Sequence, residues 1–351
     1  MASADDYELI EKDWREFTDE EIAERVALNN ALIAELLPDD PPRQVDEAIK
    51  AHHSTPKRMK SWPLRIKDPK GQLVAGGGTG FDPEHDENPD MFWLGIGVLP
   101  SERRKGLATR LLGRLVEIAE AEGRTRLLGN SNDLKPEGRL FAQAIGAEAK
   151  QANHVNHLPV DAIDRAQLEG WIAAAPDRAA DYELITWDGP CPEEHLEQFV
   201  DIILVMNTAP RDDIEMNDFT LTPAQLRESE ERALAVDVEM WTVVVRRKSD
   251  GAFAGFHDVN WAPTDPATVW IGATGVKPEH RGHAIGKWLK AAMTLRVLGD
   301  RPEVTSIRTG NADSNDAMLG INKEMGYRPL LAQTTWEISV ADAQKWLATR
   351  A

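Results

Sequence analysis

The chain has 351 residues, enough for two domains of ordinary size, and its hydrophobic content of 42% can fill packed cores. A formal net charge of −19 excludes a basic nucleic-acid-binding face and suits a protein that attracts cationic substrates. The single cysteine, Cys191, excludes an intramolecular disulfide and a cysteine-rich zinc site, so we predict no metal. No apolar run is long enough to span a membrane, and we predict a cytoplasmic protein.

The first half alternates between strand and helix patterns. We expect strands with period-two alternation and helices with apolar residues three or four apart. The predicted elements are a strand at 6–10, helices at 18–37 and 45–53, a hairpin at 62–67 and 72–78, a strand ending at 98, a helix after 106, a strand at 125–130, a helix at 137–145, a strand ending at 160 and a closing helix.

The same order of elements recurs in the second half. Residues 6–10 (Asp-Tyr-Glu-Leu-Ile) reappear unchanged at 181–185, and later landmarks repeat at offsets that stay between 175 and 181. The recurring elements are helices at 191–208 and 222–235, a hairpin at 241–247 and 252–259, a strand at 267–276, a helix after 284, a strand at 304–311, a helix at 315–325 and a strand ending at 340. A constant offset predicts a duplicated domain: 1–172, a small proline-bearing linker at 173–180, and 181–351.

Each half also contains a strand-to-helix turn built of small residues. The first turn lies between Val98 and Ala108, and the second lies between Val276 and Lys287. A helix N-terminus offers free N–H groups and partial positive charge, and glycine or alanine lets an anion approach the backbone closely. Both turns are therefore candidate phosphate sites.

The pattern Arg-x-x-Gly/Ala-x-Gly/Ala at these turns resembles the acyl-CoA signature of the GNAT superfamily of N-acetyltransferases. Arg103 to Ala108 meets the family form, and Arg281 to Gly286 departs from it at Ala284. The resemblance implies an α/β class with a mixed, mostly antiparallel sheet flanked by helices, present as two tandem GNAT domains, with acetyl-CoA as acyl donor. The cofactor-binding residues that it implies are Val98, Arg103, Arg104, Lys105, Gly106, Leu107 and Ala108 in the first half, and Val276, Arg281, Gly282, His283, Ala284, Ile285, Gly286, Lys287, Asn311 and Asn315 in the second.

Transfer to an amine requires a route for a proton. An alkyl amine has a pKa near 10.4, so exposing its lone pair at pH 7 costs about 4.6 kcal/mol. Many relatives place a glutamate six residues before the CoA-contacting valine, where this chain has Trp270 and Phe92. His257 and Asp258, or the acids of the 211–218 loop, are alternative bases, and the Thr274 hydroxyl could orient a water.

The usual acid of the family is a tyrosine, and its position is Asn322 in the second half and Ala142 in the first. Asn322 can donate a hydrogen bond to the departing sulfur but cannot deliver a proton. This leaves two readings: catalysis without a dedicated acid, or a fold that binds acyl-CoA and has lost the chemistry.

We expect the second half to be the catalyst and the first to be a degenerate copy whose turn can still hold CoA. The expected function is acetyl transfer from acetyl-CoA to a primary amine of a small cationic molecule, with no nucleic-acid or membrane partner. The alternatives are a protein N-acetyltransferase and a non-catalytic acyl-CoA sensor or scaffold. Neither the acceptor's identity nor the oligomeric state follows from the sequence.

Overall fold

The computed structural model describes residues 6–350, which form two compact units. Unit 1 contains residues 6–152, 213–217 and 333–350, and unit 2 contains residues 153–212 and 218–332. Both units are mixed α/β structures in which helices cover the faces of a mostly antiparallel sheet, as expected from the sequence. In the described part of the chain, no helix is both long and apolar enough to cross a bilayer.

Unit 1 is built around two groups of strands. Its elements are β1 (Glu8–Glu11), α1 (Asp19–Leu36), α2 (Val45–His53), β2 (Lys60–Lys67), β3 (Leu73–Phe81), β4 (Met91–Trp93), β5 (Gly95–Val98), α3 (Leu107–Ala121), β6 (Arg126–Asn132), α4 (Pro136–Ala144), β13 (Arg328–Ser339) and α11 (Val340–Ala348). The strands β1, β2, β3 and β5 form an antiparallel sheet, while β6 pairs with β4 on one side and with β13 on the other.

Local sequence explains several of these boundaries. Thr18 and Glu21 form a capping box that starts α1, since each side chain bonds to the other residue's backbone. Gly71, with φ of 82°, closes the β2–β3 turn in a conformation that favours glycine. The helix α3 buries Leu111 and Leu115 against the sheet, which places the N-terminus of α3 at the end of β5.

The fourth strand of unit 1 changes partner in its middle. β4 pairs with β6, whereas β5, after Leu94, pairs with β3. The last link between the two groups is the bond from Leu94 N to Leu128 O, at 2.7 Å. Beyond this point β5 has an edge that no strand covers among the described residues.

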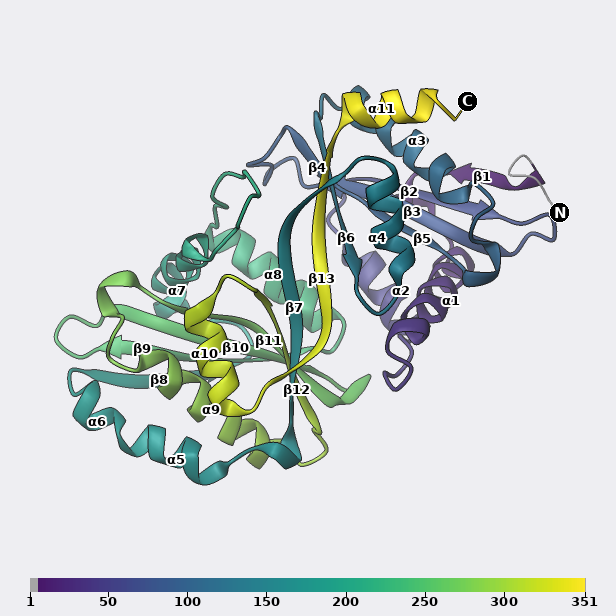
Figure 1. The fold of residues 1–351 in the computed structure, drawn as a ribbon. Coiled ribbons are helices and arrows are strands. Elements are labelled where there is room, and N and C mark those ends of the chain that lie inside the picture. Colours follow the sequence, from purple (N-terminus) through teal and green to yellow (C-terminus); the bar gives the residue numbers. More distant parts are fainter. Residues whose placement is uncertain (1–5, 351) are drawn as a thin grey trace. The chain divides into compact units, whose positions relative to one another are not determined.

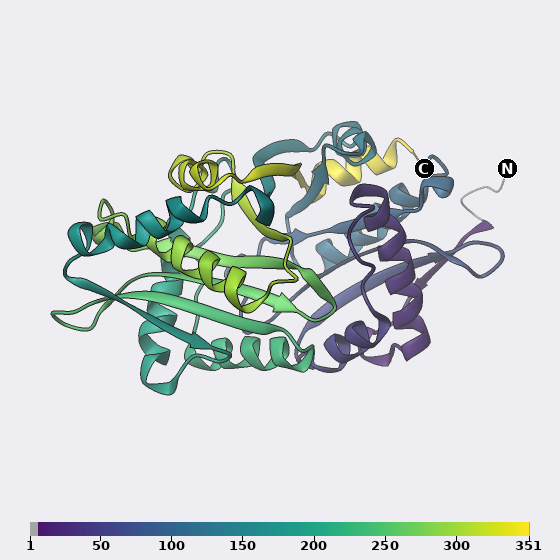
Figure 2. The ribbon, with the colours of Figure 1, turned by 90° about the horizontal axis from the view of Figure 1, so that it is seen from below.

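Unit 2 has a single six-stranded sheet in the order β7, β12, β11, β10, β9, β8. Its elements are β7 (Glu148–Pro159), α5 (Arg165–Ala173), α6 (Ala175–Arg178), β8 (Tyr182–Asp188), α7 (Leu196–Ile203), α8 (Pro223–Ala235), β9 (Glu239–Arg247), β10 (Phe253–Ala262), β11 (Asp265–Val276), α9 (Ile285–Asp300), β12 (Ser306–Ala312) and α10 (Asp316–Met325). Figure 2 shows α9 on one face of this sheet and α7 with α8 on the other. β11 and β12 are parallel and pair only over residues 268–270 and 306–308, so they also separate toward Val276.

The last strand of each half completes the other unit's sheet. We expected each half to close with its own strand, but β7 pairs with β12 over residues 153–159, and β13 pairs with β6 over residues 333–339. Figure 1 shows the yellow β13 beside β6, continuing into α11 next to α3. The compact units therefore differ from the ranges 1–172 and 181–351, because residues 153–172 belong to unit 2 and residues 333–350 belong to unit 1.

Two other segments differ from expectation. The helix expected at 191–208 is divided into 3₁₀ turns at Glu193–His195 and Leu204–Thr208 around α7. The expected linker at 173–180 contains α6, and Ala175 and Ala179 are buried in it. Cys191 lies in the loop before the first of these 3₁₀ turns and is buried, and burial raises the pKa of its thiol to about 12.

Candidate functional site

The turn after β5 forms a backbone cradle at the N-terminus of α3. Arg104 and Gly106 both have left-handed backbones, with φ of 65° and 83°. The first intrahelical bond joins Arg110 N to Gly106 O, so the preceding amides have no partner within the helix. The exposed Arg104 side chain lines the adjoining cavity and forms no ion pair with another described residue, so the turn offers N–H groups and a cation to an anion.

Arg103 holds together the elements around this turn. Its Nε donates to Val98 O at 3.2 Å, and its two Nη atoms donate to the Glu35 carboxylate of α1 at 2.9 and 2.5 Å. It also forms an ion pair with Glu137 of α4 at 3.2 Å. The hydrogen bond from Arg103 lowers the pKa of Glu35, which therefore stays ionised. In this way Arg103 fixes α1, β5 and α4 around one opening.

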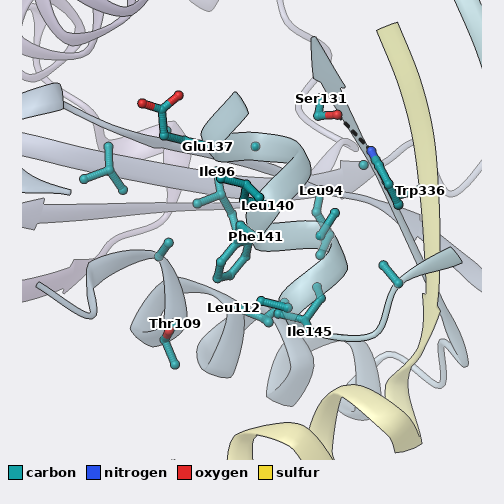
Figure 3. Close-up of a pocket in the computed structure, with 18 of the residues that line it drawn as sticks. Leu94, Ile96, Thr109, Leu112, Ser131, Glu137, Leu140, Phe141, Ile145 and Trp336 are labelled. Atoms are coloured by element: carbon teal, nitrogen blue, oxygen red, sulfur yellow. Dashed lines mark hydrogen bonds between the residues drawn. The ribbon is translucent and has the colours of Figure 1, made fainter. Parts of the chain in front are cut away.

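A cavity of about 680 Å³ adjoins the turn (Figure 3). Its lining includes Val98, Arg103, Gly106, Leu107 and Ala108 from the predicted set. Much of the rest is apolar: Leu94, Ile96, Leu112, Leu140, Phe141, Ile145 and Trp346.

Two further features of the cavity could not be assigned from the sequence. Ser131 Oγ accepts a hydrogen bond of 2.8 Å from Nε1 of Trp336, which lies on the exchanged strand β13 (Figure 3). Gly97 lies directly under α1, because a Cβ there would be 2.6 Å from Leu32 Cδ1. A larger residue at this position would force the Leu32 side chain of α1 to move.

The second turn repeats this backbone with its glycine in a different place. Gly282 and Ala284 are left-handed, with φ of 87° and 59°, so glycine occupies the first of the two positions here and the second in unit 1. Arg281 Nε donates to Val276 O at 3.1 Å, as Arg103 does to Val98 O. Its Nη2 donates to Thr208 rather than to a carboxylate.

The other residues predicted at the second turn are bonded to protein groups. His283 Nδ1 lies 3.2 Å from Arg178 O, and Lys287 is paired with Glu324. Two more of the predicted residues pack against the protein. Ile285 is buried, and a Cβ on Gly286 would lie 3.2 Å from Ile321. At the first turn, Lys105 is likewise paired, with Glu102.

Behind the second turn lies a buried polar cluster. Lys290 of α9 is only 1% exposed, and its Nζ donates to Asn322 Oδ1 at 2.8 Å. Asn322 Nδ2 donates to Asn311 Oδ1 at 2.8 Å, and the ammonium lies 5.0 Å from the centre of the Tyr327 ring. Burial lowers the pKa of Lys290 to about 7 and raises the pKa of Tyr327, whose hydroxyl has no hydrogen-bond partner among the described residues.

His257 of β10 and Thr274 of β11, both predicted as candidate catalytic residues, are register partners on neighbouring strands. His257 Nδ1 is 2.8 Å from Thr274 Oγ1 and 3.2 Å from Ala273 O. Burial, and then the charge of Lys290, lower the pKa of His257 to about 3. The imidazole is therefore neutral at physiological pH, but its Nδ1 is already bonded to the protein.

Asp258 sits at a bulge between β10 and β11. Its Oδ1 accepts from Ala273 N at 2.9 Å, and its Oδ2 lies 1.9 Å from the place where a Cβ on Gly272 would be. Burial raises the pKa of Asp258 to about 7, which suits proton transfer at neutral pH. Residue 272 must be glycine for this carboxyl to occupy the bulge.

The four predicted catalytic residues thus have defined places, and their roles stay predictions. His257 and Asn322 are buried and bonded to protein groups, and Asn315 caps α10 by accepting from Met318 N at 3.3 Å. Sequence reasoning missed Lys290 because lysine is expected on an exposed face. The duplication contained the signal, since Lys290 lies 178 residues after the buried Leu112.

This architecture matches that of known proteins. Residues 25–146 match the acetyltransferase (GNAT) family model. A tandem GNAT protein from the clavulanic acid biosynthesis pathway superposes with a TM-score of 0.78 and 24% identity, covering 95% of this chain and 98% of that protein. The chain has the tandem GNAT fold.

Other structures agree with this assignment. A GCN5-related N-acetyltransferase from Sphaerobacter thermophilus superposes with a TM-score of 0.66 at 11% identity, over 97% of both chains. A glucosamine N-acetyltransferase region of a fungal multi-domain β-N-acetylglucosaminidase gives 0.64 at 13% identity, over 95% of this chain and 38% of that one. A search of curated proteins gives no significant match. The family match falls in the half that we expected to be degenerate, and it supports acyl-CoA as the donor class.

Proposed function

We propose that this tandem GNAT protein is an N-acetyltransferase that moves an acetyl group from acetyl-CoA directly to a primary amine of a small cationic molecule, in the cytoplasm. The observation that carries the proposal is the unit 1 cavity, which joins an anion cradle to the uncovered edge of β5. The GNAT match at residues 25–146 covers the same elements.

The residues of unit 1 fit an acyl-CoA chemically. The cradle at Arg104 to Ala108 presents N–H groups and a cation to a diphosphate, and β5 has free backbone groups for the amides of the pantetheine arm. The apolar wall formed by Leu112, Phe141 and Ile145 excludes water from the bound donor. Acetyl-CoA supplies the activated acyl group, and the protein supplies position.

The same cavity contains groups for the acceptor and for the leaving sulfur. Glu35, Glu102 and Glu137 line it, but each is paired with a cation, so we base the cationic acceptor on the net charge of −19 of the whole chain. The Ser131 oxygen already accepts from Trp336, which leaves its own hydrogen to donate. We assign to Ser131 the hydrogen bond that the departing thiolate requires, in the role that sequence reasoning gave to Asn322.

This proposal places the donor in unit 1. The sequence led us to expect the catalyst in the second half, because of its asparagine-bearing block. In the structure, Asn311 and Asn322 are bonded to each other, and Asn322 also to Lys290. The cavity and the family match support the first half, and we therefore propose that unit 1 holds the donor.

The decisive experiment compares the two turns. The variants are Gly106→Asp with Ala108→Asp in unit 1 and Gly282→Asp with Gly286→Asp in unit 2, each confirmed to be folded by circular dichroism. Calorimetry with acetyl-CoA and thiol release with pooled amines are measured on both. We expect the unit 1 variant to lose binding and turnover, because each aspartate adds bulk and like charge beside the diphosphate. Loss in the unit 2 variant alone would return the catalyst to the second half.

A second candidate function follows from what the site lacks. Both halves lack the general base and the general acid that the family usually has. Phe92 and Trp270 stand where the glutamate base is expected, and Ala142 and Asn322 stand where the tyrosine acid is expected. If the wild-type protein binds acetyl-CoA but releases no thiol with any small amine or with lysine-bearing peptides, it is a non-catalytic acyl-CoA sensor. Absence of any binding would refute both functions.

A further inference from the structure

The C-terminal helix α11 runs antiparallel to α3. Gln344 Nε2 donates to Glu120 Oε2 at 3.0 Å, near the end of α3. One turn later, Leu347 lies over Gly113. Its Cδ2 is 3.9 Å from the place that a Cβ on Gly113 would occupy. Arg350, two residues after the end of α11, and Thr109, in the first turn of α3, both line the unit 1 cavity.

Arg350 is a cation with an aromatic neighbour at this end of the cavity. Its guanidinium lies 5.1 Å from the centre of the Trp346 ring, and Trp346 in turn packs edge-on against Phe141 at 6.3 Å. Among the described residues, no carboxylate forms an ion pair with Arg350. A cation without a carboxylate partner and a half-buried indole, both lining the cavity that the phosphate cradle borders, are groups that can recognise a phosphorylated nucleoside.

We infer that Arg350 binds the 3′-phosphate of CoA and that Trp346 packs against its adenine. The inference rests on the proposed binding of CoA in unit 1. In CoA the 3′-phosphate lies on the ribose next to the diphosphate, so a diphosphate at the α3 cradle brings the nucleoside to the flank that α11 covers. Arg350 thus determines whether unit 1 distinguishes CoA from a donor without this phosphate.

Unit 2 offers a contrasting arrangement. Its helix α5 packs on α9. The Lys287 ammonium lies 4.9 Å from the ring centre of Trp171, which belongs to α5. Lys287, however, is paired with Glu324, whose carboxylate neutralises the cation. The inferred 3′-phosphate contact is therefore specific to unit 1.

The test compares CoA with 3′-dephospho-CoA. Calorimetry on the full chain measures both affinities for wild type, Arg350→Gln and Arg350→Lys, with Lys345→Gln as the matched control, since Lys345 lies on the same helix and is paired with Asp342. We expect Arg350→Gln to weaken CoA binding about tenfold, as a lost charged hydrogen bond does, and to leave 3′-dephospho-CoA unchanged. Arg350→Lys should recover part of the loss, and Lys345→Gln should bind both as wild type does.

The outcomes separate this inference from the proposed function. If Arg350→Gln weakens both ligands equally, or neither, the 3′-phosphate contact is refuted although CoA binding stands. If wild type binds neither ligand, the proposed function fails first. A wild-type preference for CoA that Arg350→Gln removes supports the inference.

Discussion

The two units share one backbone plan and differ in what fills the space behind the signature helix. In unit 1 this space is bordered by Leu112, Ala142 and Ala147 and forms part of the cavity. At the corresponding positions unit 2 has Lys290, Asn322 and Tyr327, which occupy the core as a buried polar cluster. The same fold therefore supports an apolar chamber in one copy and a hydrogen-bonded network in the other.

This difference shows that a unit can retain the strand-to-helix turn and still lack the cavity behind it. Both turns preserve two left-handed residues and an arginine that caps the last carbonyl of the preceding strand. What distinguishes the units is a few core positions well inside, where a polar group must find a partner or destabilise the fold. The predictions below exchange these positions between the units.

The largest effect is expected when the unit 2 lysine is placed in unit 1. Leu112→Lys would bury an ammonium beside Ala142, which offers no side-chain acceptor. We expect a loss of about 4 kcal/mol in unfolding free energy and loss of acetyl-CoA binding, because an unpaired charge in an apolar site is strongly destabilising. Urea unfolding and calorimetry measure the two effects. Leu112→Met is the control, and a Leu112→Lys variant as stable as this control would refute the comparison.

A double-mutant cycle in unit 2 tests whether the network acts as a unit. Asn322→Ala alone leaves Lys290 without an acceptor, and we expect a loss of about 3 kcal/mol. Adding Lys290→Leu, which recreates the unit 1 pair, should recover a large part of that loss, since no buried charge then remains. Urea unfolding of both single variants and the double variant gives the coupling energy. Strictly additive effects would show that the two side chains do not depend on each other.

The local features of the fold could be predicted because their causes are local. The helix α2 begins and ends at the predicted residues, 45 and 53, and the hairpin around Gly71 lies where a glycine turn follows a β-rich run. The repeat revealed both turns, since small residues at a helix N-terminus act through their own backbone.

The exchange of β7 and β13 could not be predicted, because period-two alternation tells which residues share a face and not which strand is the neighbour. The buried cluster was missed for a related reason. Lys290 is stabilised by Asn322, 32 residues away in sequence, and no periodicity indicates such a partner. Ser131 depends in the same way on Trp336, 205 residues later.

The pH dependence of stability should isolate the buried lysine. The folded pKa of Lys290 is lowered from 10.5 to about 7, so above pH 7 the unfolded chain binds more protons than the folded one, and stability rises with pH. We expect a gain of about 2 kcal/mol between pH 7 and 9 in wild type, absent from the Lys290→Leu, Asn322→Ala variant. His257 and Asp258 contribute little in this window, since their folded pKa values are about 3 and 7 and the ordinary pKa values of histidine and aspartate lie below 7. An equal slope in both proteins would contradict the assignment.

The smallest effect concerns the glycine that the two turns place differently. Residue 106 is glycine and residue 284 is alanine at the same left-handed position of the cradle. A left-handed backbone costs a residue with a Cβ roughly 1 kcal/mol, so Ala284→Gly should stabilise unit 2 by up to about 1 kcal/mol, offset in part by the greater freedom of glycine in the unfolded chain. Gly106→Ala should destabilise unit 1 by about the same amount, and both are measured by urea unfolding. Because neither change adds charge, acetyl-CoA affinity at unit 1 should change less than twofold in Gly106→Ala. A large loss of affinity there would mean that the methyl group blocks the diphosphate, and that Ala284 alone is enough to close the second turn to CoA.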